Sequence, residues 1–257
     1  MIKNYLLRRP LLLTLFLLGY LLFLLVSLPA AQILPRLPLP AGLQLRNING
    51  TLWQGSISEV SWQKYRLQNL QWEVLFSQLW LGMPTIKLNI QDPETITATG
   101  TIGWRAKWHL SDWHIKTAAN TLQNWAPVPL PINATGAIQL NIEQLVVDHR
   151  ACQSLTGQLN WQQALINTPS GALVLGNPTA SLNCQNNAFT AAIKQDSAAL
   201  HSQVSVQLNL QGQYKLQATL RPDTELSDGL HSTLSWLGSL DNKGNILTKQ
   251  EGYLPYF

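Results

Sequence analysis

The sequence predicts a mainly β protein, in which one N-terminal transmembrane helix precedes a twisted, open, mostly antiparallel sheet with a few short helices. Three observations predict it: an apolar run without charges, apolar residues that alternate with polar ones, and glycines that recur before such stretches. Alternation with period two is typical of strands with one buried and one solvated face, which favours antiparallel sheets. The chain has 257 residues, enough for one large domain or two small ones.

The N-terminal run is free of charge from Pro10 to Pro35, and three basic residues precede it, Lys3, Arg8 and Arg9. A helix over residues 10–31 would be about 33 Å long, which is enough to cross a hydrocarbon core of ~30 Å. The basic side chains predict that residues 1–9 are cytoplasmic. The alternative is a cleaved signal peptide, but Leu28 and Pro29 make a poor cleavage site. We therefore expect an uncleaved, single-pass anchor in the inner membrane.

Net charge argues against a nucleic-acid partner. The formal net charge is +4, and the three basic residues before Pro10 account for most of it, so the rest of the chain is nearly neutral. A duplex-binding surface depends on many Lys and Arg contacts with phosphates. We expect no nucleic-acid binding.

Beyond the apolar run, residues 32–42 form a proline-rich spacer, and we predict an extended polyproline conformation for its stretch "LPRLPLPAG" (34–42). Residues 43–257 form the predicted periplasmic β-domain. Its alternating stretches place apolar residues on common strand faces: Leu70, Trp72, Val74 and Phe76; Ile86, Leu88 and Ile90; Trp104, Ala106, Trp108 and Leu110; and Val204, Val206, Leu208 and Leu210.

A recurrent unit with the pattern Gly-x-apolar-x-apolar predicts a meander of hairpins. The unit begins at Gly100, Gly136, Gly157, Gly171 and Gly212. Because glycine adopts positive φ without strain, each of these glycines is predicted at a hairpin corner. Apolar spacing predicts two short helices, over residues 118–125 and 230–237.

The stretch "GTLWQG", from Gly50 to Gly55, is predicted to begin the first hairpin. Trp53 is expected to face inward as a core anchor, and Trp72 lies on the buried face of a later strand. The alternative reading of a Trp between two glycines is a ligand-binding loop.

The two cysteines, Cys152 and Cys184, are predicted to form a disulfide, because the periplasm permits one to persist. By closing the loop from Cys152 to Cys184, the disulfide would contribute roughly 3–4 kcal/mol of stability. Two buried free thiols are the alternative.

Residues with chemistry are few, and we expect no catalytic residue, no cofactor and no metal. The best cluster is His109, Asp112 and His114, but in a strand His109 would point away from the other two. His149, His201 and His231 are solitary and are expected at the surface. We therefore expect that the protein is not an enzyme.

The basic start, the apolar run, the proline spacer and "GTLWQG" together resemble the type II secretion system protein N family. The resemblance continues through "LQNLQWEVLFSQLWLG" (67–82), "TGQLNWQQA" (156–164) and "NLQGQYKLQATLRP" (209–222). The C-terminal "NILTKQEGYLPYF" departs from the closing strand expected of the family. The domain also looks like the AsmA-like superfamily, whose curved sheets form grooves used in envelope lipid handling.

The resemblance implies an inner-membrane protein with a periplasmic β-domain, which takes part in the export of folded proteins across the outer membrane. Its implied partners are other secretion components, either the inner-membrane platform or the secretin. The AsmA-like resemblance implies the alternative, a groove that binds lipid or another hydrophobic ligand. A polar or covered groove would favour protein docking, and an open groove lined by Trp and Leu would favour lipid.

Overall fold

The structure, a computed structural model, describes residues 3–125, 132–148, 151–223, 225–236 and 238–254. The chain divides into two compact units, residues 1–74 and residues 75–257. Antiparallel strands make up most of the second unit and follow the helices in the first, which confirms the predicted mainly β class with few helices.

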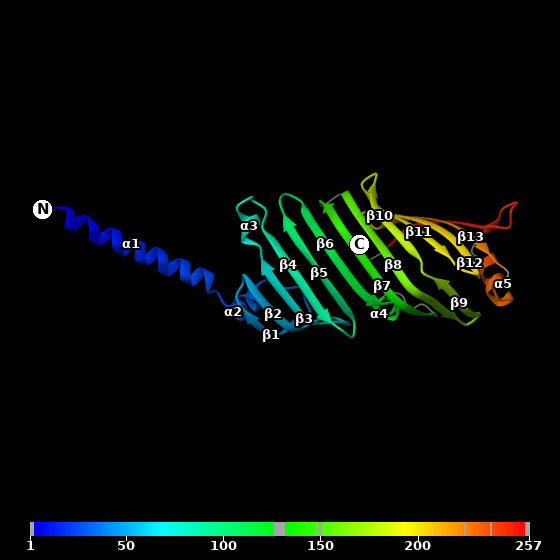
Figure 1. Cartoon of the computed structure of the whole chain (residues 1–257), viewed down its shortest axis with the longest axis horizontal. Helices are drawn as coiled ribbons and strands as arrows, with labels where there is room; N and C mark the ends of the chain where they lie inside the picture. Colours follow the sequence, from blue (N-terminus) through cyan, green and yellow to red (C-terminus); the bar gives the residue numbers. More distant parts are fainter. Residues whose placement is uncertain (1–2, 126–131, 149–150, 224, 237, 255–257) are drawn as a thin grey trace. The chain divides into compact units, whose positions relative to one another are not determined.

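The first unit contains a long helix and a three-stranded meander (Figure 1). Helix α1 (Lys3–Val26) is followed by α2 (Ala30–Ile33), the 3-10 turn η1 (Leu34–Arg36) and strands β1 (Leu43–Gly50), β2 (Gln54–Trp62) and β3 (Tyr65–Val74). The side chains of residues 12–26 in α1 are all exposed. Within the described part of the chain, the structure contains no helix that combines the length and the apolarity needed to cross a membrane.

The sequence had predicted an extended spacer, but the spacer is not extended throughout. Residues 32 and 33 end α2, and residues 34–36 form η1, which is closed by a hydrogen bond of 3.2 Å from the amide of Leu37 to the carbonyl of Leu34. Pro35 lies in the first turn of η1, where a missing N–H costs no hydrogen bond and the fixed φ suits a helix. The polyproline prediction therefore fails for residues 34–36.

The second unit is an open antiparallel sheet whose strands lie side by side almost in chain order (Figure 1). The order is β4 (Thr85–Asp92), β5 (Ile96–Trp104), β6 (Trp108–Ala118), β7 (Asn133–Val147), β8 (Cys152–Thr168), β10 (Thr179–Gln185), β11 (Ala188–Asp196), β12 (Leu200–Leu208), β13 (Gln213–Pro222), β15 (Ile246–Tyr253) and β14 (Ser239–Leu240). Strand β9 (Gly171–Gly176) pairs with the C-terminal half of β8.

Three short helices accompany this sheet: α3 (Phe76–Leu79), α4 (Ala119–Trp125) and α5 (Asp228–Ser235). The helices predicted over 118–125 and 230–237 correspond to α4 and α5, although residue 237 lies outside the described residues. Helix α5 provides the main buried cluster of the unit, which consists of Leu200, Leu226, Leu230, Leu234 and Ile246. One face of the sheet is thus covered near β12 and β15.

The prediction that Trp104, Ala106, Trp108 and Leu110 share one strand face is wrong. Trp104 ends β5 and Trp108 begins β6, and these two residues pair across the hairpin. Ala106 lies in the turn between them with φ of +58°, a left-handed conformation that a strand does not contain. The apolar alternation therefore continues through a turn that has no glycine or proline to mark it.

The glycine prediction holds at two of its five positions. Gly171 (φ +136°) and Gly212 (φ +82°) precede or open strands in turn conformations. Gly100, Gly136 and Gly157 instead lie inside β5, β7 and β8. Hairpin geometry does not explain these three glycines. A tryptophan on the neighbouring strand lies against Gly100, whereas Gly136 has φ of +110° at an irregularity in the pairing of β7 with β8, where a Cβ would lie 2.5 Å from the carbonyl oxygen of Gln162.

Tryptophan covers glycine across neighbouring strands in both units. A Cβ at Gly100 would lie 2.4 Å from the indole of Trp113, and Nε1 of Trp113 donates to the carbonyl of Thr101 at 2.9 Å. A Cβ at Gly136 would lie 2.7 Å from Nε1 of Trp161. The third pair is Gly55 with Trp72 in the first unit, where the corresponding distance is 2.4 Å.

These pairs serve the same physical purpose. Glycine leaves space on the strand, and the indole fills this space and shields backbone that would otherwise be exposed. The indole N–H then finds a carbonyl partner, as a half-buried polar group requires. Trp161 donates to the carbonyl of Thr135 at 3.0 Å, and Trp72 donates to the carbonyl of Leu52 at 3.1 Å.

The predicted disulfide is present between Cys152 and Cys184, whose Cα atoms are 5.7 Å apart. Cys152 begins β8 and is 1% exposed, while Cys184 lies near the end of β10. The bond therefore links β8 to β10 beyond the residues that these strands pair. Strand β9, which also pairs with β8, lies in the chain between the two cysteines.

The C-terminal segment, whose pairing the sequence left open, forms β15 along the whole of β13, from Tyr253 opposite Gln213 to Ile246 opposite Leu220. On its other side β15 pairs with β14 only at Ile246 and Leu247. Among the described strands, none lies beside residues 249–253 on that side, and all five residues are exposed.

We expect Trp113→Ala to lower the free energy of unfolding of the full-length chain in detergent by about 3–5 kcal/mol. The substitution leaves a cavity over Gly100 and removes the donor to Thr101. Trp108→Ala, on the same strand but 45% exposed, is the control and should cost less than about 1 kcal/mol. If denaturant titrations show that Trp113→Ala and Trp108→Ala lose the same free energy of unfolding, the proposed role of the Trp–Gly pair is wrong.

Candidate docking groove

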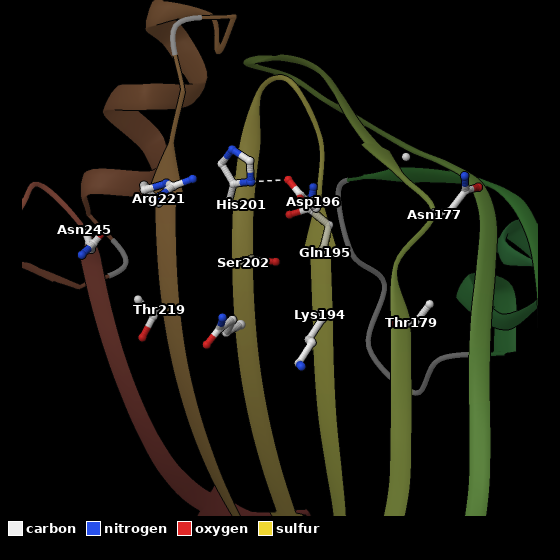
Figure 2. Close-up of a pocket in the computed structure, with 12 residues that line it drawn as sticks. Asn177, Thr179, Lys194, Gln195, Asp196, His201, Ser202, Thr219, Arg221 and Asn245 are labelled. Atoms are coloured by element: carbon white, nitrogen blue, oxygen red, sulfur yellow. Dashed lines mark ion pairs between the residues drawn. The ribbon is translucent and has the colours of Figure 1, made fainter.

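A polar hollow of about 640 Å³ lies on strands β10 to β13 (Figure 2). Every residue that lines it, except one glycine, has a polar or charged side chain: Gly176, Asn177, Thr179, Lys194, Gln195, Asp196, His201, Ser202, Gln203, Thr219, Arg221 and Asn245. We call this hollow the polar groove. Among the residues that the structure describes, no apolar side chain lines it.

Antiparallel register explains how residues distant in sequence meet in the polar groove. One cross-strand row contains Thr179, Lys194, Gln203 and Thr219, each paired with the next. A second row contains Asp196, His201 and Arg221. Because side chains opposite each other in a ladder point to the same face, both rows project into the groove.

The opposite face of the same strands is apolar. Ile193, Val204 and Leu220 alternate with the groove residues along β11, β12 and β13, and all three are half-buried. Leu200 is 4% exposed because it lies in the cluster under α5. The pleat therefore separates a polar surface from an apolar surface that α5 covers in part.

His201 lies between two carboxylates at the end of the groove. Its Nδ1 contacts Oδ1 of Asp196, the ion pair drawn in Figure 2, and its Nε2 lies 3.3 Å from Oδ2 of Asp223. A neutral imidazole can donate from only one nitrogen, so both contacts are hydrogen bonds only when the ring is protonated. The sequence had presented His201 as solitary, and the register of β11, β12 and β13 corrects this.

Two cations face the groove from different strands. Lys194 projects from β11 and Arg221 from β13, and both side chains are exposed. Neither forms a salt bridge with another residue that the structure describes. A guanidinium can bind a carboxylate with two parallel hydrogen bonds, and an ammonium adds a point charge. The groove thus offers cations and amides to a polar partner with acidic groups.

Asn245 completes the rim, and the turn before β15 holds it in place. Its backbone amide donates to Oδ1 of Asp241 at 2.8 Å, and its Nδ2 donates to Oδ2 at 2.7 Å. These hydrogen bonds from Asn245, with a further one from the amide of Lys243, lower the pKa of Asp241 below its ordinary value. Asp241 therefore remains a carboxylate that fixes the rim.

The motif "GTLWQG" lies elsewhere, in the first unit, where it forms the turn between β1 and β2. Gly50 and Gly55 pair across this turn. Gly50 has φ of +88°, and a Cβ there would lie 2.5 Å from the carbonyl oxygen of Gln54. Only glycine fits this position without strain.

Trp53 lies in that turn and is half-buried, not on a strand face. Its Nε1 donates to the carbonyl of Leu25 at 2.9 Å, and the amide of Leu52 donates to the carbonyl of Leu28 at 3.0 Å. The last carbonyls of a helix lack intrahelical partners. The turn therefore supplies donors to the C-terminal end of α1 and to the residues that follow it.

The predicted His109, Asp112 and His114 cluster lies in β6. Asp112 has φ of +55° at an irregularity in the pairing of β5 with β6, and Nδ1 of His114 lies 2.9 Å from Oδ1 of Asn141. Asp112 and His114 are exposed on either side of the buried Trp113. Among the described residues, no group of three or more His, Cys, Asp or Glu side chains is arranged to hold a metal ion.

Sequence comparison identifies the family. The profile described as "Type II secretion system (T2SS), protein N" matches residues 41–248. The chain belongs to this family. The type II secretion system protein N of Aeromonas hydrophila is 33% identical over 248 residues, which cover 95% of this chain and 98% of the relative.

Two further proteins of the same name extend the comparison. That of Pectobacterium carotovorum subsp. carotovorum is 34% identical over 92% of this chain and 94% of its own length. That of Vibrio cholerae is 32% identical over 89% of this chain and 92% of its own length. No solved structure matches. The AsmA-like resemblance stays a prediction.

We expect Trp53→Phe to destabilise the full-length protein in detergent by about 0.5–1.5 kcal/mol, because the carbonyl of Leu25 loses its donor while most of the ring area remains. Amide exchange of residues 50–55 should become faster at the same time. Gln54→Ala, at an exposed side chain, serves as the control and should leave both unchanged. Unaltered stability and exchange in Trp53→Phe would show that the indole hydrogen bond does not hold the turn.

Proposed function

We propose that this protein is an accessory structural component of the type II secretion system, anchored in the inner membrane, whose periplasmic sheet docks other components. Family membership supports the place in the secretion system. The observation that carries the docking role is the polar groove. We further propose that the protein binds its partners without catalysing a reaction.

The N-terminal helix supports the proposed anchor. Helix α1 extends from Lys3 to Val26, and its described side chains from Leu12 onward are exposed and almost all apolar. Exposed apolar surface of this extent requires a cover. The basic residues at its start favour a cytoplasmic N-terminus, which would put the strands in the periplasm.

The composition of the groove supports a protein partner over a lipid chain. An alkyl chain in the groove would desolvate Lys194, Arg221 and the amides around them without replacing their hydrogen bonds, which is unfavourable. A peptide segment with carboxylates can satisfy the same groups. We propose that the partner is a component of the inner-membrane platform or of the secretin, and that it presents an acidic surface.

A second candidate function, binding of lipid or another hydrophobic ligand, is favoured by a different surface. The apolar face of β11 to β13 is only half-buried beyond the residues under α5. A hydrophobic ligand on this face would bury Ile193, Val204 and Val206 further. The two functions use opposite faces, so substitutions can separate them.

The proposed topology predicts that a reporter fused after residue 45 is active only if it is a reporter that functions in the periplasm. Alkaline phosphatase at this position should be active, and green fluorescent protein exported through the same pathway should remain dark. A mature protein that begins near Gln32, or a cytoplasmic reporter signal at residue 45, would contradict the uncleaved anchor.

For the groove, we expect that Lys194→Glu combined with Arg221→Glu reduces secretion of folded substrates and lowers recovery of crosslinked partners more than tenfold. Reversal of charges that pair across an interface costs several kcal/mol. Lys87→Glu, at an exposed position on β4, is the control and should secrete like the parent. Normal secretion by the double variant at equal membrane levels would exclude the groove as the docking site.

A substitution on the apolar face tests the second candidate function, the binding of a hydrophobic ligand. Val206→Ser should leave secretion intact if the partner is a protein in the groove. Loss of secretion in Val206→Ser together with normal secretion in the groove variant would favour the hydrophobic ligand instead.

A further inference from the structure

The segment between β3 and β4 exposes a concentrated apolar surface. Trp80 is 92% exposed and Leu81 is 66% exposed, while Phe76 and Leu79 are each 48% exposed. From Leu75 to Ile86 the chain contains no ionisable residue. Large apolar side chains exposed together mark an interaction site, whereas single ones do not.

The segment is an ordered turn. The amide of Leu75 donates to the carbonyl of Thr85 at 2.9 Å, which closes the base of the loop. Within it, the amides of Leu81 and Gly82 donate to the carbonyls of Gln78 and Leu79 at 3.1 and 3.0 Å. Hydrogen bonds thus fix the backbone that presents Trp80 and Leu81.

Val74, the residue that precedes this segment in the chain, is linked to the end of α1 through Trp53. Val74, the last residue of β3, donates its amide to the carbonyl of Trp53 at 2.7 Å. Trp53 in turn donates its indole N–H to the carbonyl of Leu25, in the last turn of α1. The chain therefore leaves the first unit beside the end of the helix that we propose as the anchor.

Chain length then limits how far Trp80 can lie from that point. Trp80 is the sixth residue after Val74, and four of the five residues between them form α3. With ~1.5 Å per helical residue and ~3.5 Å per extended one, the reach is about 13 Å. If α1 is anchored, this brings Trp80 to the surface of the same membrane.

We propose that residues 76–81 contact the outer surface of the inner membrane, with Trp80 and Leu81 inserted among the lipid headgroups. The proposal rests on the anchoring proposed above. Tryptophan prefers this interfacial layer, because its ring is apolar and its N–H still finds polar partners there. The lack of charge from Leu75 to Ile86 favours a lipid surface over a protein docking site, which would need polar groups for specificity.

This contact would be a second point of attachment, beyond α1. It would fix the start of the β4 to β14 sheet against the membrane and thereby restrict its orientation. Trp236 is similarly exposed, at 90%, but it follows α5 and precedes β14, the last strand in the order of this sheet.

The test uses the full-length protein in vesicles of phosphatidylethanolamine and phosphatidylglycerol that contain a spin-labelled lipid quencher. Leu81→Cys is labelled with an environment-sensitive fluorophore, since the native cysteines form a disulfide. Leu240→Cys, at a position that is 63% exposed, is the matched control, and Leu18→Cys reports insertion of α1. We expect blue-shifted, strongly quenched emission at residue 81, at least fivefold more quenched than at residue 240.

The outcomes separate the two proposals. Quenching at residue 18 without quenching at residue 81 overturns the surface contact and leaves the anchor intact. No quenching at residue 18, with the protein recovered outside the vesicles, overturns the anchor and with it the contact. If residue 81 stays unquenched in vesicles but becomes shielded in native envelopes that contain the secretion apparatus, a protein covers the segment and the lipid proposal is wrong.

Discussion

Antiparallel hydrogen bonding between strands that are neighbours, or near neighbours, in sequence is the constraint on which the structure depends. Each strand from β5 to β8 pairs with the strands before and after it, and the ladder continues through β10 to β13 and β15. Such a sheet grows by hairpins, and in residues 75–257 its first and last strands do not pair with each other. The sheet therefore stays open, and its faces and its last edge remain available to partners.

An open sheet has little interior, so its strands need other means of stabilisation. Tryptophans that cover glycines provide one, because each buries an indole against backbone and satisfies its N–H with a carbonyl. The disulfide provides another, because it links the start of β8 to the end of β10 beyond the residues that these two strands pair. The pleat of the strands then separates the polar groove from the apolar face, which lets one thin layer present two different surfaces.

Much of the fold follows from local sequence, and the candidate site does not. Alternation along residues 204–208 or 70–74 reports strands directly, because the period of a strand is visible within a few residues. The hairpin at Trp104 to Trp108 escaped prediction since its turn residue is Ala106, which normally avoids positive φ. Gly100 and Gly136 were misassigned to corners because the reasons for them, a tryptophan on another strand at Gly100 and an irregularity in the pairing of β7 with β8 at Gly136, depend on register.

The groove could not be predicted for the same reason. Lys194, His201 and Arg221 come from three strands, and each looks like an ordinary solvated position in its own strand. Only the pairing of β11 with β12 and of β12 with β13 brings them into neighbouring rows on one face of the sheet. The alternation did predict that these positions lie on the polar face, but the sequence contains no signal for which polar residues of the different strands meet.

The measurement that most directly tests whether the polar groove docks another secretion component is site-specific photo-crosslinking in the native envelope. A photo-reactive residue replaces Thr219, which is exposed in the polar groove, and in a second strain it replaces Thr99, which is exposed on β5. The account predicts a protein adduct from position 219 that disappears when the other secretion components are deleted, with little or none from position 99. Adducts with lipid alone at position 219, or equal protein adducts at both positions, would contradict it.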